Sequence, residues 1–183
     1  QPIDAPKAAS ILRNRKGVGE AELGLANEMA INQFIAHHSV IFQPEKKRMW
    51  VSTAPWQCGK YVAYDLNKIF SDSIDFNHEI YTENLTVPAD SFLQQQEYQQ
   101  LMTYKRLAPV LRKQIKKKER LDEQTLHAFQ HANPHFFYVY ELLGDYYHAT
   151  GQQDKALRNW KKALLLPIPK RSESERIEHK INN

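Results

Sequence analysis

Two features in the first half of this sequence could take part in chemistry: a cysteine at position 58 and adjacent histidines at positions 37 and 38. Cys58 is the only cysteine, so the chain cannot form an internal disulfide. As a nucleophile, its thiol would need a base such as His37 or His38 close by in the fold. A lone cysteine beside a glycine in a corner is more often a packing residue, and we expect that role for Cys58.

The two histidines are also of a residue type that binds metal ions. Adjacent side chains in a strand point to opposite faces, so His37 and His38 cannot easily hold one ion together. No further histidine, cysteine or carboxylate lies nearby at ligand spacing. The pattern therefore predicts no metal site and gives no sign of a cofactor. One of the two histidines is expected to face a pocket, and the other to be packed or exposed.

The elements that would position these residues are short strands. Residues 34–42 and 48–53 are rich in aromatic and β-branched side chains, and they flank the turn sequence Pro-Glu-Lys-Lys at 44–47. Residues 61–66 form a third run of this kind. The pattern predicts an antiparallel meander of three strands. Because residues 40–42 are apolar in succession, the first strand is expected to be covered on both faces.

The segments around this sheet have weaker signals. Asp4 is a suitable N-cap for a first helix that includes Leu12, and Gly17 should end that helix. Residues 20–33 are ambiguous between helix and the approach to a strand. Residues 71–90 are expected to form loops with one short extended piece at 85–87.

After Pro88 the pattern becomes helical. Apolar residues between 98 and 115 recur at intervals of three and four, and Pro109 should kink or split that helix. Asp122 is a good N-cap for the next helix, which Asn133 and Pro134 should end. We therefore divide the chain into a domain over residues 1–88 and an all-helical tail over residues 89–183.

Within the tail, residues 136–167 have the spacings of one tetratricopeptide-like helical hairpin. Gly144 and Ala156 are small where two helices would cross closely, and Gly151 suits the turn between them. A peptide-binding groove usually needs about three stacked repeats, so one repeat predicts a packed hairpin. The hairpin motif consists of Tyr140, Leu143, Gly144, Tyr147, Ala156, Trp160, Ala163 and Pro167.

Ser172 and Glu175 have the spacing of a capping box for a last helix.

The charge pattern is weak evidence for a partner. The formal charge is +4, with much of the excess in residues 112–120. That run lacks interleaved aromatic residues or glycine, so it predicts a solvated helix end and no nucleic-acid partner. The longest apolar run, residues 163–166, is far below the ~20 residues of a membrane span.

Several long segments resemble one enzyme family. The closing strands of the penicillin acyltransferase-like N-terminal nucleophile hydrolases (the aminopenicillanic acid acyltransferase family) are similar to NEMAINQFIAHHSVIF, RMWVSTAPWQ and YVAYDL. The helical tail that bacterial members append is similar to NPHFFYVYELLGDYYHATGQQDKALRNWKKAL. The resemblance implies a partial αββα sandwich with antiparallel strands, followed by an all-helical tail.

The resemblance also implies a reaction. Such enzymes cleave themselves and expose a cysteine at a new N-terminus, which attacks an amide or acyl thioester with its own α-amine as base. Residue 1 is Gln1 and Cys58 is internal, so the resemblance implies a nucleophile upstream and no catalytic residue here. Arg13 lies in a Ser-Ile-Leu-Arg stretch that resembles one preceding these strands in relatives. Arg13, His37 and His38 are therefore the candidate substrate-binding residues, with Arg13 to hold a carboxylate or to organise the site.

The resulting expectation is the C-terminal part of a bacterial, autoprocessing amidohydrolase or acyltransferase. Its partners would be the upstream part of the same polypeptide and a small acyl-amide or acyl-thioester substrate, with no cofactor and no metal. The chain by itself would be inactive, and relatives suggest an extracytoplasmic location. The alternative is a non-enzymatic scaffold or interaction protein that uses the helical tail.

Overall fold

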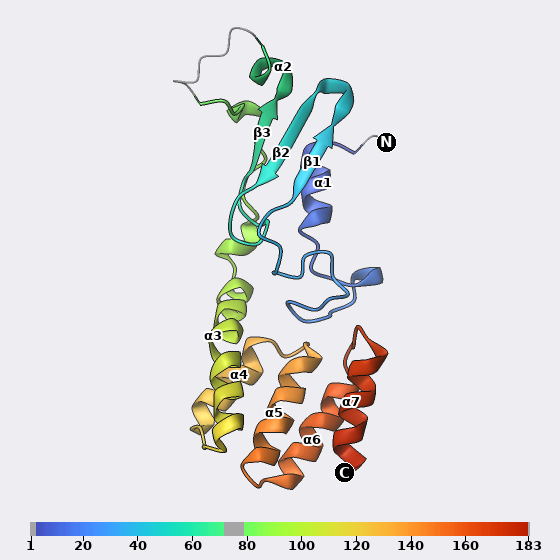
Figure 1. Ribbon diagram of the computed structural model, residues 1–183, viewed down its shortest axis with the longest axis vertical. Coiled ribbons are helices and arrows are strands. Elements are labelled where there is room, and N and C mark those ends of the chain that lie inside the picture. Colours follow the sequence, from blue (N-terminus) through green and yellow to red (C-terminus); the bar gives the residue numbers. More distant parts are fainter. Residues whose placement is uncertain (1–2, 72–78, 183) are drawn as a thin grey trace. The chain divides into compact units, whose positions relative to one another are not determined.

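The computed structural model describes residues 3–71 and 79–182. This part of the chain is mixed α+β, with a three-stranded antiparallel sheet and seven α-helices, so the predicted α+β class is confirmed. The chain divides into two compact units. The first contains Gln1–Asn14 and Ile31–Gln94 and holds the sheet, and the second contains Arg15–Ala30 and Gln95–Asn183 and holds helices α3 to α7 (Figure 1).

The sheet of the first unit is the predicted meander. Strands β1 (Val40–Gln43), β2 (Arg48–Ser52) and β3 (Tyr61–Asp65) pair antiparallel in the order β1-β2-β3. A 3-10 turn at Pro44–Lys46 joins the first two strands, and Lys47 after it is left-handed with φ of 50°. The turn residues therefore set the register, as the sequence indicates.

The first strand is shorter than predicted, because residues 34–39 are not part of it. Asn32 accepts a hydrogen bond from the backbone amide of Phe34 through its side-chain oxygen, at 3.0 Å. Phe34 itself has a φ of +54°. This local turn bends the chain away from the extended conformation, and aromatic content alone does not reveal it.

Helix α1 (Ala5–Leu12) packs on one face of the sheet. The carboxylate of Asp4 accepts from the backbone amide of Lys7 at 2.8 Å, which confirms the predicted N-cap. We expected this helix to end at Gly17, but it already ends at Leu12. Just beyond it, the backbone carbonyl of Asn14 leaves the helical pattern and accepts from the backbone amide of Asn32 at 2.8 Å. The buried core of this face comprises Ala9, Trp50, Tyr61, Ala63 and Val87.

The opposite face of the sheet is less covered. Directly paired residues share a face, and the register places six apolar side chains together there. None of the six is buried, and Phe42 is 65% exposed. We predicted that β1 is covered on both faces. The described residues cover only one of them. The six residues, named the open face below, are Val40, Phe42, Met49, Val51, Val62 and Tyr64.

The rest of the first unit is short elements and loops. Helix α2 (Leu66–Ile69) follows β3 directly, and 3-10 turns span Glu83–Leu85 and Ser91–Gln94. Val87 pairs with Tyr61 in an isolated bridge, so the extended piece expected at 85–87 is confirmed only at Val87, because Leu85 belongs to a 3-10 turn. Part of the loop region predicted at 71–90, residues 72–78, lies outside the described residues.

The second unit begins with residues that precede the sheet in sequence. The buried side chain of Asn27 donates to the carbonyls of Leu23 and Pro167, at 3.0 and 3.1 Å. Asn133 likewise bonds both backbone groups of Leu25, at 2.9 and 2.7 Å. These bonds tie the segment to the helices. A 3-10 turn at Val18–Glu20 is its one regular element among the residues described.

Five helices follow, and Pro109 does not split the first of them. Pro109 is exposed, while Leu107, Ala108 and Leu111 beside it are buried. Their packing holds both halves of the helix despite a proline cost of about 3 kcal/mol. The predicted cap at Asp122 is confirmed, since its carboxylate accepts from the amide of Thr125 at 2.7 Å. The helices are α3 (Gln96–Lys117), α4 (Glu123–Ala132), α5 (Phe137–Ala149), α6 (Gln153–Leu164) and α7 (Arg171–Asn182).

Helices α5 and α6 form a close hairpin. A Cβ added at Gly144 would lie only 2.3 Å from Cδ1 of Trp160, so the indole fills the space above the glycine. Ala156 is fully buried, and Gly151 has a φ of +76° in the turn between the helices. The predicted capping box at Ser172 is wrong, because α7 already begins at Arg171 and Ser172 lies inside its first turn.

We expect Gly144→Ala to destabilise the helical unit by about 1–3 kcal/mol, because the new methyl group would overlap the Trp160 ring. Helix propensity alone would act the other way and favour alanine by about 1 kcal/mol. Urea unfolding followed by circular dichroism measures the change.

The matched control repeats Gly144→Ala in a Trp160→Leu background, where the space above residue 144 is larger. There the added cost should disappear or become a gain. An equal cost in both backgrounds would contradict the packing explanation.

Candidate functional site

Arg13 follows α1 and lies at the centre of the polar contacts in the first unit. Its guanidinium donates from Nε to the carbonyl of Gln57 at 3.3 Å, and from Nη2 to the carbonyls of Gly59 and Pro88 at 2.7 and 2.8 Å. It also lies over the ring of Tyr61, with Cζ 5.1 Å from the ring centroid. One cation thus joins, through three backbone carbonyls, segments that are far apart in sequence.

The corner at residues 53–59 is held from both sides. Trp56 and Gln57 are consecutive left-handed residues, with φ of +43° and +59°, a conformation that costs about 1–2 kcal/mol per residue. The buried side chain of Gln57 donates to the carbonyl of Leu12 at 2.7 Å. A Cβ on Gly59 would lie 2.2 Å from Oγ1 of Thr53, so only glycine fits there. Together with Arg13, these contacts fix the corner against the end of α1.

Cys58 lies inside this corner and is fully buried. The side-chain amide of Asn32 lies 3.3 Å from its sulfur. His37 and His38 are both exposed, whereas the thiol of Cys58 is buried. The structure therefore does not bring thiol and imidazole together as a nucleophile and its base, and it gives Cys58 the surroundings of a packing residue.

A set of hydroxyl groups lies beside Arg13. Ser39 and Tyr61 share a short hydrogen bond between their hydroxyls, and the hydroxyl of Ser52 accepts from the amide of Ser39 at 2.7 Å. Burial raises the pKa of the Tyr61 phenol, and the hydrogen bond with Ser39 and the charge of Arg13 offset only part of that shift. The phenol therefore stays protonated at neutral pH. Tyr61 and Asn32 were not among the residues that sequence reasoning singled out, because a tyrosine in a strand and an asparagine before a strand have no distinctive spacing.

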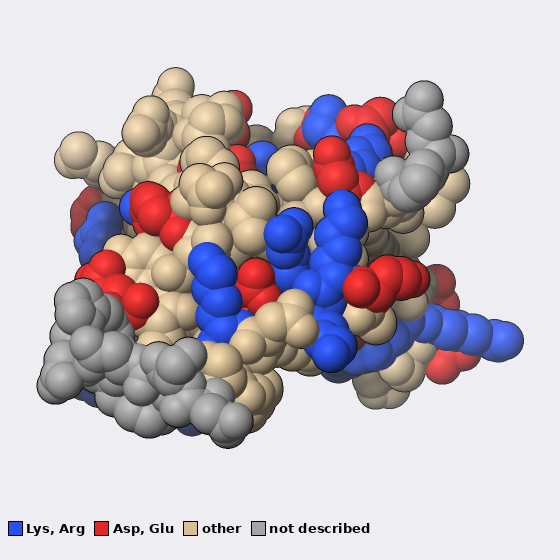
Figure 2. Space-filling model, turned by 90° about the horizontal axis from the view of Figure 1, so that it is seen from above, with Lys and Arg blue, Asp and Glu red and all other residues tan. Residues whose placement is uncertain are grey.

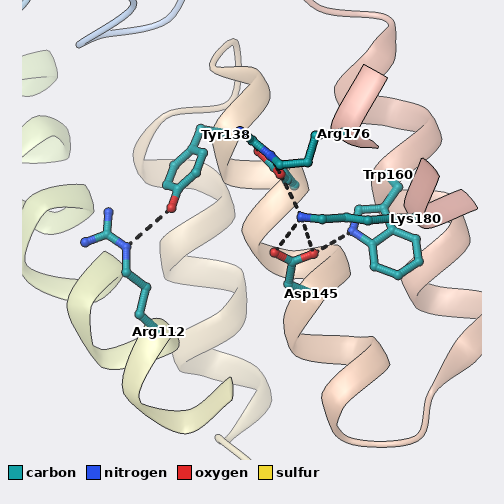
Figure 3. A network of polar contacts seen from close by, with 7 residues as sticks. Arg112, Tyr138, Asp145, Trp160, Arg176 and Lys180 are labelled. Atoms are coloured by element: carbon teal, nitrogen blue, oxygen red, sulfur yellow. Dashed lines mark hydrogen bonds and ion pairs between the residues drawn. The ribbon is translucent and has the colours of Figure 1, made fainter. Parts of the chain in front are cut away.

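The second unit has its own charged network, between α5, α6 and α7 (Figure 3). Glu141 is buried and accepts two hydrogen bonds from Arg176, both at 2.8 Å, and one from Lys180 at 2.7 Å. Lys180 also binds Asp145, whose carboxylate accepts from the indole of Trp160 at 3.0 Å. Burial acts to raise the pKa of Glu141, but the hydrogen bonds and charges of Arg176 and Lys180 outweigh it and lower that pKa.

Charged side chains of both signs also lie on the surface. Figure 2 shows Lys and Arg side chains close to Asp and Glu on the face in view. The basic run predicted at residues 112–120 covers the exposed end of α3, where cations favour the helix C-terminus. In the part of the chain that the structure describes, no helix is long and apolar enough to cross a membrane.

No family model, no curated protein and no solved structure matches this chain.

Arg13→Lys should lower the free energy of opening of the first unit by about 2–3 kcal/mol, because one ammonium group cannot reach all three carbonyls that the guanidinium binds. Hydrogen exchange of the β3 amides measures this energy. Lys7→Met, which removes an exposed charge from α1, is the matched control and should change it by less than about 0.5 kcal/mol. An effect of Arg13→Lys no larger than that of Lys7→Met would contradict the stabilising role of the three guanidinium hydrogen bonds.

Glu141 should make the helical unit sensitive to acid. Its pKa is lowered in the folded state, so the network stabilises the fold above the ordinary carboxyl pKa of about 4.3, and this stability is lost as the pH falls through the lowered value. Glu141→Gln should therefore reduce the unfolding free energy at pH 7 by about 1–3 kcal/mol and remove part of its decline in acid.

Glu175→Gln is the control, because Glu175 forms an exposed pair with Arg171 that is worth little. Urea unfolding of the three proteins between pH 3 and pH 7 gives both quantities. The same acid profile in wild type and Glu141→Gln would contradict the assignment.

Proposed function

We propose that this chain forms the C-terminal part of an N-terminal nucleophile amidohydrolase or acyltransferase. The first unit, which contains Gln1–Asn14 and Ile31–Gln94, would supply one layer of its αββα sandwich, and the second unit would supply the appended helical tail. The observation that carries the proposal is the difference between the two faces of the sheet. Helix α1 covers one face, and the open face carries six apolar side chains, none of them buried.

A layer of a sandwich requires one face covered by helices and one apolar face free to pack on a second sheet. In an αββα arrangement each sheet has helices on its outer face and packs its inner face on the other sheet. Val40, Val51 and Val62 form one row across the open face, and Phe42, Met49 and Tyr64 form the next. Branched and aromatic side chains in cross-strand rows are typical of a surface that interdigitates with a second sheet.

The proposed chemistry uses an upstream cysteine at a new N-terminus, with its α-amine as the base. The α-amine takes the proton of the thiol, and the thiolate attacks the carbonyl of a small acyl amide or acyl thioester. The C–N or C–S bond of the substrate breaks, and the amine or thiol leaves with the proton of the α-ammonium group. Water or a second amine, deprotonated by the α-amine, then attacks the cysteine thioester, which releases the acyl group and restores the thiol. Arg13 acts as a positioning residue, because its observed acceptors are backbone carbonyls that fix the corner. His37 and His38 are exposed just before β1 and stay candidates for substrate contact.

A second candidate is a scaffold that uses the helical unit alone. The α5–α6 hairpin, closed by Trp160 over Gly144, supports it, because this hairpin has the spacing of repeats that bind peptides. The hairpin is equally suited to a packed tail on an enzyme, so the activity assay decides between the two candidates.

The test compares this chain alone with the protein that includes its upstream segment, using a panel of acyl amides and acyl thioesters. We expect turnover only when the upstream segment is present, and an intact-mass measurement should show cleavage immediately before a cysteine. Cys58→Ala in the longer protein should keep turnover within a few-fold of wild type, because the thiol is fully buried. Turnover by the isolated chain that Cys58→Ala abolishes would overturn the proposal.

A second arm tests the open face directly. Phe42→Lys should weaken association with the upstream segment and reduce turnover, since Phe42 lies in one of the two rows of the open face. Phe70→Lys is the matched control, because Phe70 is 80% exposed and lies after α2, outside that face. Absence of turnover in every preparation would favour the scaffold.

A further inference from the structure

A pair of histidines on α4 has the arrangement of a metal chelate. His127 and His131 are four residues apart on the helix and both are exposed. Their rings are stacked, with centroids 3.8 Å apart and planes inclined by 25°. Positions i and i+4 share one face of a helix, so both imidazoles reach the same patch of solvent.

The hydrogen bond of His131 orients its second nitrogen for a metal. Its Nδ1 lies 3.0 Å from the carbonyl oxygen of His127. A carbonyl can only accept, so Nδ1 carries the proton, and in the neutral ring Nε2 has the free lone pair. Metal-binding histidines are commonly held in this way, with one ring nitrogen donating to a backbone carbonyl and the other bound to the ion.

We infer that His127 and His131 form a two-histidine site for a borderline divalent transition metal ion such as Zn²⁺, Ni²⁺ or Cu²⁺. Imidazole nitrogen suits these ions, whereas Mg²⁺ and Ca²⁺ prefer oxygen ligands. The rings are stacked, so the His127 ring must rotate about its side-chain bonds for the two Nε2 atoms to converge, and exposed side chains change rotamer within nanoseconds. His131 is in the last turn of α4, where a positive charge is favoured by the helix dipole.

The site holds two protein ligands and leaves the other positions to water. No group of three or more histidine, cysteine or carboxylate side chains that could hold a metal occurs among the described residues. Glu123, one turn before His127, pairs with Lys155 at 3.5 Å. An ion here is therefore exchangeable and open to a further ligand from outside the chain. This inference concerns the helical unit and is independent of the proposed acyl chemistry.

The test titrates Ni²⁺ into the chain by calorimetry in a non-coordinating buffer. We expect one site per chain that His127→Gln and His131→Gln each weaken at least tenfold, a loss of the size expected when a metal site is damaged. Electron paramagnetic resonance of the Cu²⁺ form should show two equatorial nitrogens. Mg²⁺ should not bind.

His135→Gln is the matched control, because His135 is also exposed but lies beyond the end of α4. It should leave the Ni²⁺ affinity unchanged. Binding that survives both α4 substitutions would overturn the inference, as would a loss of affinity in His135→Gln equal to that in His131→Gln. All three substitutions are on the surface, and circular dichroism checks that each protein is folded.

Discussion

The sheet of the first unit has apolar side chains on both faces, and apolar surface must be removed from water for such a sheet to be stable. Helix α1 and the segment around Val87 cover one face, where Trp50 and Tyr61 are almost completely buried. Among the described residues no equivalent layer covers the open face, and Phe42 is 65% exposed on it. Burying an exposed side chain of that size is worth about 1.5–3 kcal/mol, and the other five, which are already half-buried, would each add less. A second layer over this face would therefore be stabilising. The uncovered apolar surface of the open face is therefore more informative about function than any single polar residue.

Arg13 stabilises another part of the first unit, the corner at residues 53–59. The corner at residues 53–59 contains two consecutive left-handed residues and presents backbone carbonyls away from the sheet ladder. Burial without partners would cost such carbonyls more than a normal hydrogen bond gains. One planar guanidinium satisfies two of them, those of Gln57 and Gly59, together with the carbonyl of Pro88, and it also lies over Tyr61. The arginine thereby stabilises the corner that encloses Cys58. This contact joins residue 13 to a loop more than forty residues later in the sequence.

Local patterns predicted the local structure well. The meander, the cap at Asp4 and the cap at Asp122 each depend on residues within a few positions of one another. The errors arose where a side chain or distant packing overrode the pattern. Asn32 turned the chain before β1, and buried neighbours kept α3 whole across Pro109. The sequence could not predict the polar contacts of the candidate sites, because only the tertiary fold brings the partners together. Examples are the contact of Arg13 with Pro88 and that of Glu141 with Lys180.

The helical unit shows how one small residue and one buried charge together define a packed hairpin. Gly144 lets the indole of Trp160 approach the backbone of α5, and that approach places the indole nitrogen 3.0 Å from Asp145. Asp145 in turn shares Lys180 with the buried carboxylate of Glu141. Apolar packing alone would allow α7 to slide along the hairpin, whereas a bidentate arginine contact and a shared lysine accept only one position. The charges therefore select the register of α7, and the close contact at Gly144 brings the Asp145 carboxylate within their reach.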